Sequence, residues 1–284
     1  MKIHEIKSIE LGSFTTMTTA INVLFSIIAT AVLSGLMLLL VPDSGSVIIY
    51  LIPTFIVGTF MFSIYSTFTT GMFYNLLSSK LKTICIAIDN DKLVKISTNE
   101  TAIMTAIIGT IQIILLYLSS VFILPIVLSS MMQTLMFTGQ QAVAYSLYQL
   151  LILISQPTTI IMIIFGVFII SFVFTLLGTY IYNFLAKSGR GFGLKLSKNG
   201  KLTQIDSFDK LSLAIAFAII SGILNIIFAV IMIISGSNVF NALIGILAGF
   251  VGGFIELFIL ALFYNYLAGK ITGINLELND FKIN

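Results

Sequence analysis

Six long apolar stretches alternate with short polar stretches along the chain. They cover approximately residues 13–40, 47–77, 102–128, 158–185, 211–234 and 239–267. A helix needs about 20 apolar residues to cross the hydrocarbon core of a bilayer, and each stretch meets that length. The pattern therefore predicts six transmembrane helices.

A second, shorter pattern follows the second, fourth and sixth stretches, where apolar residues occupy every other position. These residues are Ile84, Ile86 and Ile88; Phe192, Leu194 and Leu196; and Ile274, Leu276 and Leu278. A period of two predicts a short strand with one apolar face. Further short apolar stretches at 6–9, 93–96 and 202–205 precede the other three helices, and Asn199-Gly200 is a favoured hairpin turn.

The two patterns repeat together around a Tyr-Asn pair. The pairs are Tyr74-Asn75, Tyr182-Asn183 and Tyr264-Asn265, and each has a small residue three positions past the Asn. We therefore expect three tandem repeats, covering 1–91, 92–200 and 201–284, with an outer insert at 129–156 in the second. The predicted fold is an all-α integral membrane protein whose six transmembrane helices form three parallel two-helix repeats, with short cytoplasmic β-strands at the repeat junctions.

The strands at the two ends of the chain have no neighbour in sequence. The strands near 89–91 and 198–201 can pair as hairpins, whereas residues 3–9 and 274–278 cannot. Three equivalent repeats around one axis would bring these two ends together. We therefore expect the N-terminal and C-terminal strands to pair within one chain, because each would otherwise expose an unpaired edge.

Composition excludes a soluble domain. Hydrophobic residues make up 58% of the chain, charged residues make up 9%, and the mean hydropathy is +1.12. A soluble domain carries about 25% charged residues. The single cysteine, Cys85, rules out an intrachain disulfide, and the single histidine, His4, leaves little for histidine chemistry. We expect no metal site and no cofactor.

The basic residues predict the orientation. With six spans, all 14 Lys and Arg fall on one side, and the opposite loops contain a single acid, Asp43. The positive-inside rule then places both termini in the cytoplasm of a multi-pass cell-membrane protein. The net charge of +3 reflects this orientation, so the expected partner is the lipid bilayer and not nucleic acid.

The insert at 129–156 is too polar for a comfortable span. It contains Gln133, Gln140, Gln141 and Gln149 among Met, Leu and Tyr. We interpret it as an interfacial helix or hairpin on the outer side, and a re-entrant segment is the alternative.

Glu256 is the one ionisable residue deep within a span. Its helix also carries Gly245, Gly249 and Gly253, a stripe that favours close helix packing. Because Glu256 lies about 20° from the azimuth of Gly249, we expect its carboxylate to face a helix interface. Its role as an ion or proton site, or as a buried structural acid, stays open.

The repeated Tyr-Asn pairs have a structural interpretation. The asparagines at 75, 183 and 265 are expected to cap backbone groups where helix becomes strand, with the tyrosines anchored at the membrane interface. Positions that recur in a repeat usually serve the repeat itself.

The third unit resembles a prokaryotic transmembrane domain of unknown function. That domain has two helices, then Y-N-x-[LI]-A and a G-G-I-x-[LV]-x-[LV] tail, matched here by Tyr264-Asn265-Tyr266-Leu267-Ala268 and by the tail from Thr272 to Leu278. The chain departs from the tail at Thr272, where the first glycine would stand. The resemblance implies a membrane location and the repeated fold, and it implies no catalytic residue.

These features favour a non-enzymatic scaffold or assembly protein whose cytoplasmic strands dock a partner or a second copy. The alternative is a small-solute or ion transporter that uses Glu256 near the midplane. A helix broken at Pro53, in the second span, would favour transport.

Overall fold

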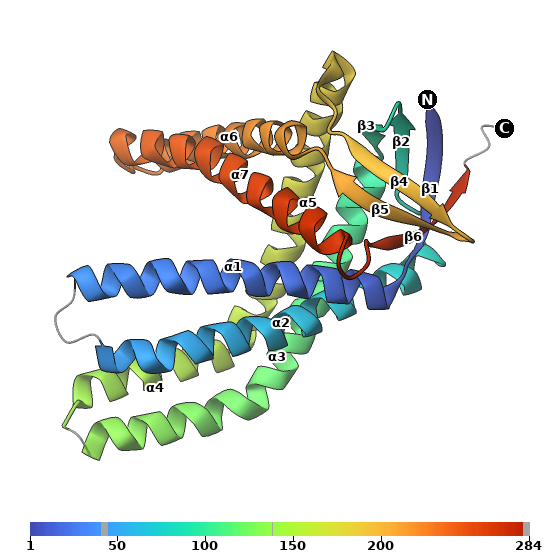
Figure 1. Cartoon of the computed structure of the whole chain (residues 1–284). Coiled ribbons are helices and arrows are strands. Elements are labelled where there is room, and N and C mark those ends of the chain that lie inside the picture. Colours follow the sequence, from blue (N-terminus) through green and yellow to red (C-terminus); the bar gives the residue numbers. More distant parts are fainter. Residues whose placement is uncertain (41–44, 138, 281–284) are drawn as a thin grey trace. The chain divides into compact units, whose positions relative to one another are not determined.

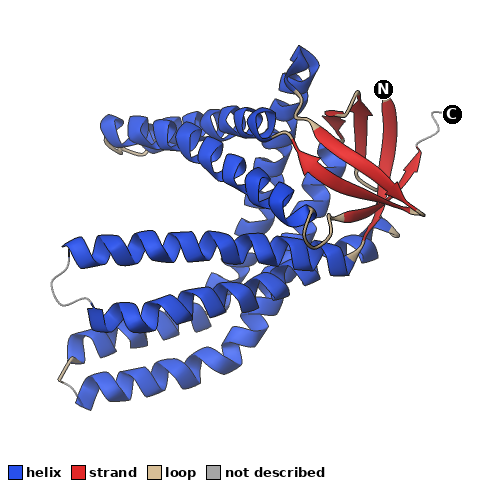
Figure 2. Ribbon diagram, viewed as in Figure 1, coloured by secondary structure: helices blue, strands red, loops and turns tan. Residues whose placement is uncertain are grey.

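The computed structural model describes residues 1–40, 45–137 and 139–280 of the chain, so Asp43 lies outside the described residues. Two compact units divide the chain. We call them the sheet unit (Met1–Thr101 with Thr175–Asn284) and the central unit (Ala102–Phe174). Helices dominate both, and the strands gather into a single sheet (Figures 1 and 2).

Seven α-helices are present among the described residues. They are α1 (Leu11–Leu40), α2 (Gly45–Ser78), α3 (Thr98–Phe137), α4 (Gln141–Ser155), α5 (Pro157–Leu185), α6 (Lys210–Ile234) and α7 (Val239–Ala268). All except α4 are long and apolar enough to cross a membrane, in agreement with the six predicted spans. Helix α2 continues through Pro53 without a break.

The predicted insert at 129–156 is helical. Helix α3 continues past the expected end of its span to Phe137, and α4 fills most of the remaining residues. Gly139, with a φ of +76°, lies in the short connection between the two helices. A groove of about 900 Å³ separates the end of α3 from α4, and its walls include Met132, Met136, Tyr145 and Tyr148.

Six antiparallel strands form the sheet. They are β1 (Lys2–Ile9), β2 (Cys85–Asp89), β3 (Lys92–Ile96), β4 (Leu194–Asn199), β5 (Leu202–Phe208) and β6 (Asn275–Asp280), in the spatial order β3-β2-β1-β6-β5-β4. The predicted pairing of the two ends of the chain is confirmed, because β1 pairs with β6 with Ile6 opposite Leu278. The two predicted hairpins, β2–β3 and β4–β5, are also present.

The outermost strands of this sheet meet each other. An isolated antiparallel bridge joins Lys92 to Gly193. The Leu93 N–H donates to the Phe192 carbonyl at 3.0 Å, and the Leu194 N–H donates to the Asp91 carbonyl at 2.8 Å. The six strands therefore close into a small ring, which we call the strand ring, and closure removes part of the exposed edge that an open sheet would leave.

An aromatic cluster fills the strand ring where the helices join it. Phe192 lies 5.4 Å from Tyr182, 6.2 Å from Phe208 and 6.5 Å from Phe217, measured between ring centroids. Phe208 and Tyr264 lie 4.7 Å apart in an edge-to-face arrangement, a favourable geometry for aromatic rings. The core of the sheet unit thus lies between the strands and the strand-facing ends of the helices.

Candidate functional site

Each repeated tyrosine donates a hydrogen bond to the opening strand of its own repeat. The bonds run from Tyr74 to the Ile6 carbonyl, from Tyr182 to the Leu93 carbonyl and from Tyr264 to the Ile205 carbonyl. All three tyrosines are buried. A buried phenol needs a hydrogen-bond partner, and here the strand backbone supplies it. The tyrosines therefore hold strands and are not exposed interface anchors.

Each repeated asparagine bonds both backbone groups of one strand residue. Asn75 accepts from the Ile9 N–H at 2.7 Å and donates to the Ile9 carbonyl at 2.8 Å. Asn183 does the same to Ile96, and Asn265 to Phe208, at 2.7–2.8 Å. A carboxamide carries the donor and the acceptor of a peptide group, so it can replace a neighbouring strand where the ladder ends. We call each Tyr-Asn pair with its strand partners a clamp.

These bonds agree only partly with the expected capping role. The asparagines do satisfy backbone groups, but those groups belong to the end of the opening strand and not to the end of their own helix. Each target residue lies two positions before the first residue of a helix: Ile9 before α1, Ile96 before α3 and Phe208 before α6. In each repeat, the clamp therefore connects the start of the first helix to the end of the last helix.

The first residue after each opening strand links the strand ring further. The backbone N–H groups of Glu10, Ser97 and Asp209 donate to the carbonyls of Asn275, Cys85 and Gly193, at 2.8–2.9 Å. In each case the acceptor lies in the tail of the preceding repeat, and for Glu10 that is the last repeat of the chain. These bonds therefore run around the strand ring in one direction.

The same three positions begin the helices, a feature that the sequence prediction missed. The Glu10 carboxylate accepts from the Gly12 and Ser13 N–H groups, and that of Asp209 accepts from the Leu211 and Ser212 N–H groups. These are N-caps, which satisfy otherwise unpaired donors in the first turn. The sequence signal for these caps is an acid directly after the opening strand, followed three residues later by a serine: Glu10 with Ser13, and Asp209 with Ser212. In the middle repeat the order is reversed, with Ser97 first and Glu100 three residues later.

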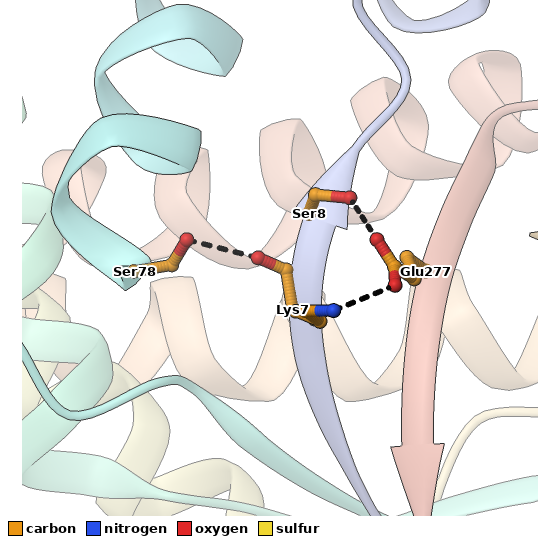
Figure 3. A network of polar contacts seen from close by, with 4 residues as sticks. All are labelled: Lys7, Ser8, Ser78 and Glu277. Atoms are coloured by element: carbon orange, nitrogen blue, oxygen red, sulfur yellow. Dashed lines mark hydrogen bonds and ion pairs between the residues drawn. The ribbon is translucent and has the colours of Figure 1, made fainter. Parts of the chain in front are cut away.

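Two carboxylates of the strand ring have lowered pKa values. The hydrogen bond from the Ser13 side chain lowers the pKa of Glu10, with the backbone N–H groups adding to it against the effect of burial. Lys7, 3.0 Å away, lowers the pKa of Glu277, and Ser8 donates to the same carboxylate (Figure 3). In the same network Ser78 donates to the Lys7 carbonyl at 2.9 Å. Burial raises the pKa of the free thiol of Cys85.

Glu256 departs from its predicted position. Within the described residues its side chain is exposed on α7, and it does not face the neighbouring helix. The contact line on α7 follows residues four apart, through Gly249 and Gly253 to the partly buried Leu257. Such a ridge rotates around the helix as it advances, and Glu256 falls beside it. Glu256 therefore lies outside the α6–α7 interface, where its azimuth alone had placed it.

The glycine stripe packs over part of its length. A Cβ on Gly249 would lie 2.3 Å from Asn225 Nδ2, and one on Gly253 would lie 2.9 Å from Ser221 Cβ, both on α6. A Cβ on Gly245 would meet nothing within 4 Å. Close approach of α6 and α7 therefore depends on two of the three predicted glycines.

Strand β4 has an open edge among the described residues of the strand ring. Strand β4 pairs with β5 along its length, but its other edge touches β3 only at the bridge of Gly193. On β3, by contrast, the Tyr182 and Asn183 side chains form hydrogen bonds with backbone groups of Leu93 and Ile96. The outer edge of β4, from Lys195 to Asn199, is therefore the candidate for a contact outside this chain.

Comparison with known proteins gives no relative: no family model, no curated protein and no solved structure matches the chain. Within residues 1–40, 45–137 and 139–280, no group of three or more His, Cys, Asp and Glu side chains could hold a metal ion.

Proposed function

We propose that this protein is a non-enzymatic membrane scaffold or assembly protein, built from three tandem repeats whose cytoplasmic strands form a docking layer. The outer edge of β4 carries the proposal, because from Lys195 to Asn199 it has no strand partner among the described residues, in a ring held by repeated clamps. An added strand can extend such an edge through backbone hydrogen bonds. The partner is a second copy or another protein.

The spacing of the clamps supports the repeats at 1–91, 92–200 and 201–284. In each clamp the carbonyl bonded by Tyr precedes the residue bonded by Asn by three positions. The strand residue whose carbonyl accepts from Tyr also donates its own N–H to a tail carbonyl, which lies nine positions past the Asn of the same repeat. In the first repeat this bond runs from the Ile6 N–H to the Ile84 carbonyl. Unrelated segments would have no reason to share this register. It also agrees with the proposed resemblance to a prokaryotic transmembrane domain of unknown function.

The filled interior of the strand ring favours a scaffold over a conduit. The aromatic cluster of Tyr182, Phe192, Phe208, Phe217 and Tyr264 occupies the interior where the helices join the strands. The unbroken course of α2 through Pro53 also supports the scaffold, because midplane sites of transporters are typically formed by interrupted helices.

Transport remains the second candidate because of Glu256. A carboxylate at the centre of a membrane helix costs about 2.5–3.5 kcal/mol on insertion scales. Its exposed position on α7 leaves its carboxylate accessible to another segment, a second copy or an ion. A Glu256→Gln variant that folds normally but abolishes a measured ion or solute flux would favour this candidate.

A photo-crosslinking residue at Lys195 tests the docking edge directly. In native membranes it should form a discrete cross-linked product, either a dimer of this chain or a complex with one other protein. The control is the same residue at Lys201, which lies in the turn beyond the paired part of β4. Equal labelling at both positions, or a spread of products, would count against docking at β4.

Cysteine accessibility tests the proposed orientation. In a Cys85→Ser background, cysteines at Gln140 and Ser237 should react with an impermeant reagent from outside, and one at Lys198 should not. Labelling of Lys198→Cys in intact cells would contradict cytoplasmic termini. A third expected outer position, Ser44, lies outside the described residues.

A further inference from the structure

Basic side chains gather where the last helix of each repeat enters the strand ring. We call this set the junction belt: Lys80 and Lys82 after α2, Lys187 and Arg190 after α5, and Lys270 after α7. All five are exposed, and each lies four to seven residues past a clamp asparagine. These helices lead into β2, β4 and β6, which alternate around the strand ring with β1, β3 and β5. The belt is therefore distributed around the whole ring.

Three of the acids near the junction belt are already engaged, whereas Glu100, in the first turn of α3, takes part in no ion pair within the described residues. Glu10 and Asp209 accept hydrogen bonds from helix N–H groups, and Glu277 accepts from Lys7 and Ser8. None of the five belt cations takes part in an ion pair with any other described residue. The junction where helices meet strands thus carries five exposed cations that no ion pair within the described residues neutralises.

Large exposed apolar side chains accompany these cations. The residue directly after each clamp asparagine is Leu76, Phe184 or Tyr266, and their exposed fractions are 51%, 69% and 62%. Each precedes a basic residue by about one helical turn. An apolar or aromatic group followed by a cation fits the boundary of a bilayer, with the first at the acyl chains and the second at the phosphates.

We infer that the junction belt binds the phosphate groups of anionic phospholipids in the leaflet that faces the strand ring. A single basic side chain near an anionic surface favours association by roughly fivefold. This inference goes beyond the proposed docking function and requires only that the helices cross a bilayer. If no partner docks at β4, the inference of lipid binding is unaffected.

A second physical explanation of the belt predicts a different result. Cations near the C-terminal end of a helix also interact favourably with the helix dipole. In that case the belt would stabilise the helices equally in any lipid, and it would show no preference for anionic headgroups.

The experiment measures lipid selectivity of the full-length protein in reconstituted membranes. Spin-labelled phosphatidylglycerol and phosphatidylcholine report the ratio of their association constants at the protein surface. The belt variant combines Lys80→Gln, Lys187→Gln and Lys270→Gln, one from each loop. The control variant combines Lys2→Gln, Lys198→Gln and Lys201→Gln, which change the net charge equally. Lys2 begins β1, and Lys198 and Lys201 lie at the tip of the β4–β5 hairpin, so all three are roughly 20 Å of extended strand from the helices.

We expect the natural protein to prefer phosphatidylglycerol severalfold, the belt variant to lose at least half of this ratio, and the control variant to retain it. A ratio of one in the natural protein would overturn the inference, as would equal losses in both variants. A belt variant with unchanged ratio but lower thermal stability in both lipids would favour the dipole explanation. If the belt variant does not fold, the natural protein is measured at increasing potassium chloride concentration. Its ratio of association constants should then fall toward one, and a ratio independent of salt would contradict lipid phosphate binding.

Discussion

Polar side chains of the sheet unit form long-range bonds in addition to bonds within their own helices, whereas three serines of the central unit bond within their own helix. The long-range bonds join segments far apart in the chain, as when Asn265 bonds Phe208 and Tyr182 bonds Leu93. In the central unit the hydroxyls of Ser119, Ser130 and Ser146 each donate to the carbonyl four residues earlier in the same helix. The first arrangement specifies a tertiary structure, whereas the second only satisfies a side chain within its own helix.

This difference shows where the fold is determined. A local hydroxyl bond survives in any packing of its helix, so it cannot select one packing over another. A clamp forms only when strand and helix are in register, and breaking it leaves backbone groups unpaired. The central unit also has no charged residue from Ala102 to Phe174, so no ion pair between its own side chains can fix its packing.

Loss of a clamp asparagine should have the largest effect. Asn265→Ala leaves both the N–H and the carbonyl of Phe208 without their partner, which should cost about 2–4 kcal/mol. Thermal unfolding in detergent measures the loss, with Ser146→Ala in the central unit as control, expected within about 0.5 kcal/mol. If both variants unfold alike, polar bonds do not distinguish the two units.

Helix packing inside the sheet unit should respond next. Gly253→Val places a side chain against Ser221 and should cost about 1–3 kcal/mol, because packed interfaces tolerate added volume poorly. Gly245→Val meets open space in this chain and should be nearly neutral. Equal destabilisation at both positions would indicate that Gly245 packs against something other than α6.

The N-cap of α1 should produce a smaller, pH-dependent effect. Because the pKa of Glu10 is lowered in the folded protein, its contribution is present above its ordinary value of 4.5 and is lost as the pH falls through the lower folded value. We expect about 0.5–1 kcal/mol at neutral pH, since the group is largely solvated. Glu10→Gln should remove this part of the acid sensitivity, and an unchanged acid transition in the variant would exclude Glu10 as its source.

Much of the sheet unit could be predicted from the sequence because its signals are periodic and repeated. The alternation from Ile84 to Ile88, together with the Tyr-Asn register, predicted the strands and the pairing of β1 with β6. The bonding partners of Asn75 could not be predicted, because a pattern shows that a residue recurs but not which backbone group it reaches. The N-caps at Glu10 and Asp209 were predictable from local chemistry and were missed.

The errors elsewhere have physical causes. Hydropathy indicates where a helix crosses a membrane but not where it ends, so α3 extends past its predicted span to Phe137. Its 40 residues correspond to about 60 Å, roughly twice the hydrocarbon thickness. Glu256 was misplaced because helical azimuth does not include the path of the contact ridge across α7.

A disulfide between the two ends of the chain tests the central claim, that the N-terminal and C-terminal strands pair within one molecule. In a Cys85→Ser background, Glu5→Cys with Asn279→Cys places the thiols on directly opposed residues of β1 and β6. We expect an intramolecular cross-link in monomeric protein, with much less for Glu5→Cys paired with Leu278→Cys, whose side chains point to opposite faces. Cross-links only between molecules, or none at the opposed pair, would contradict it.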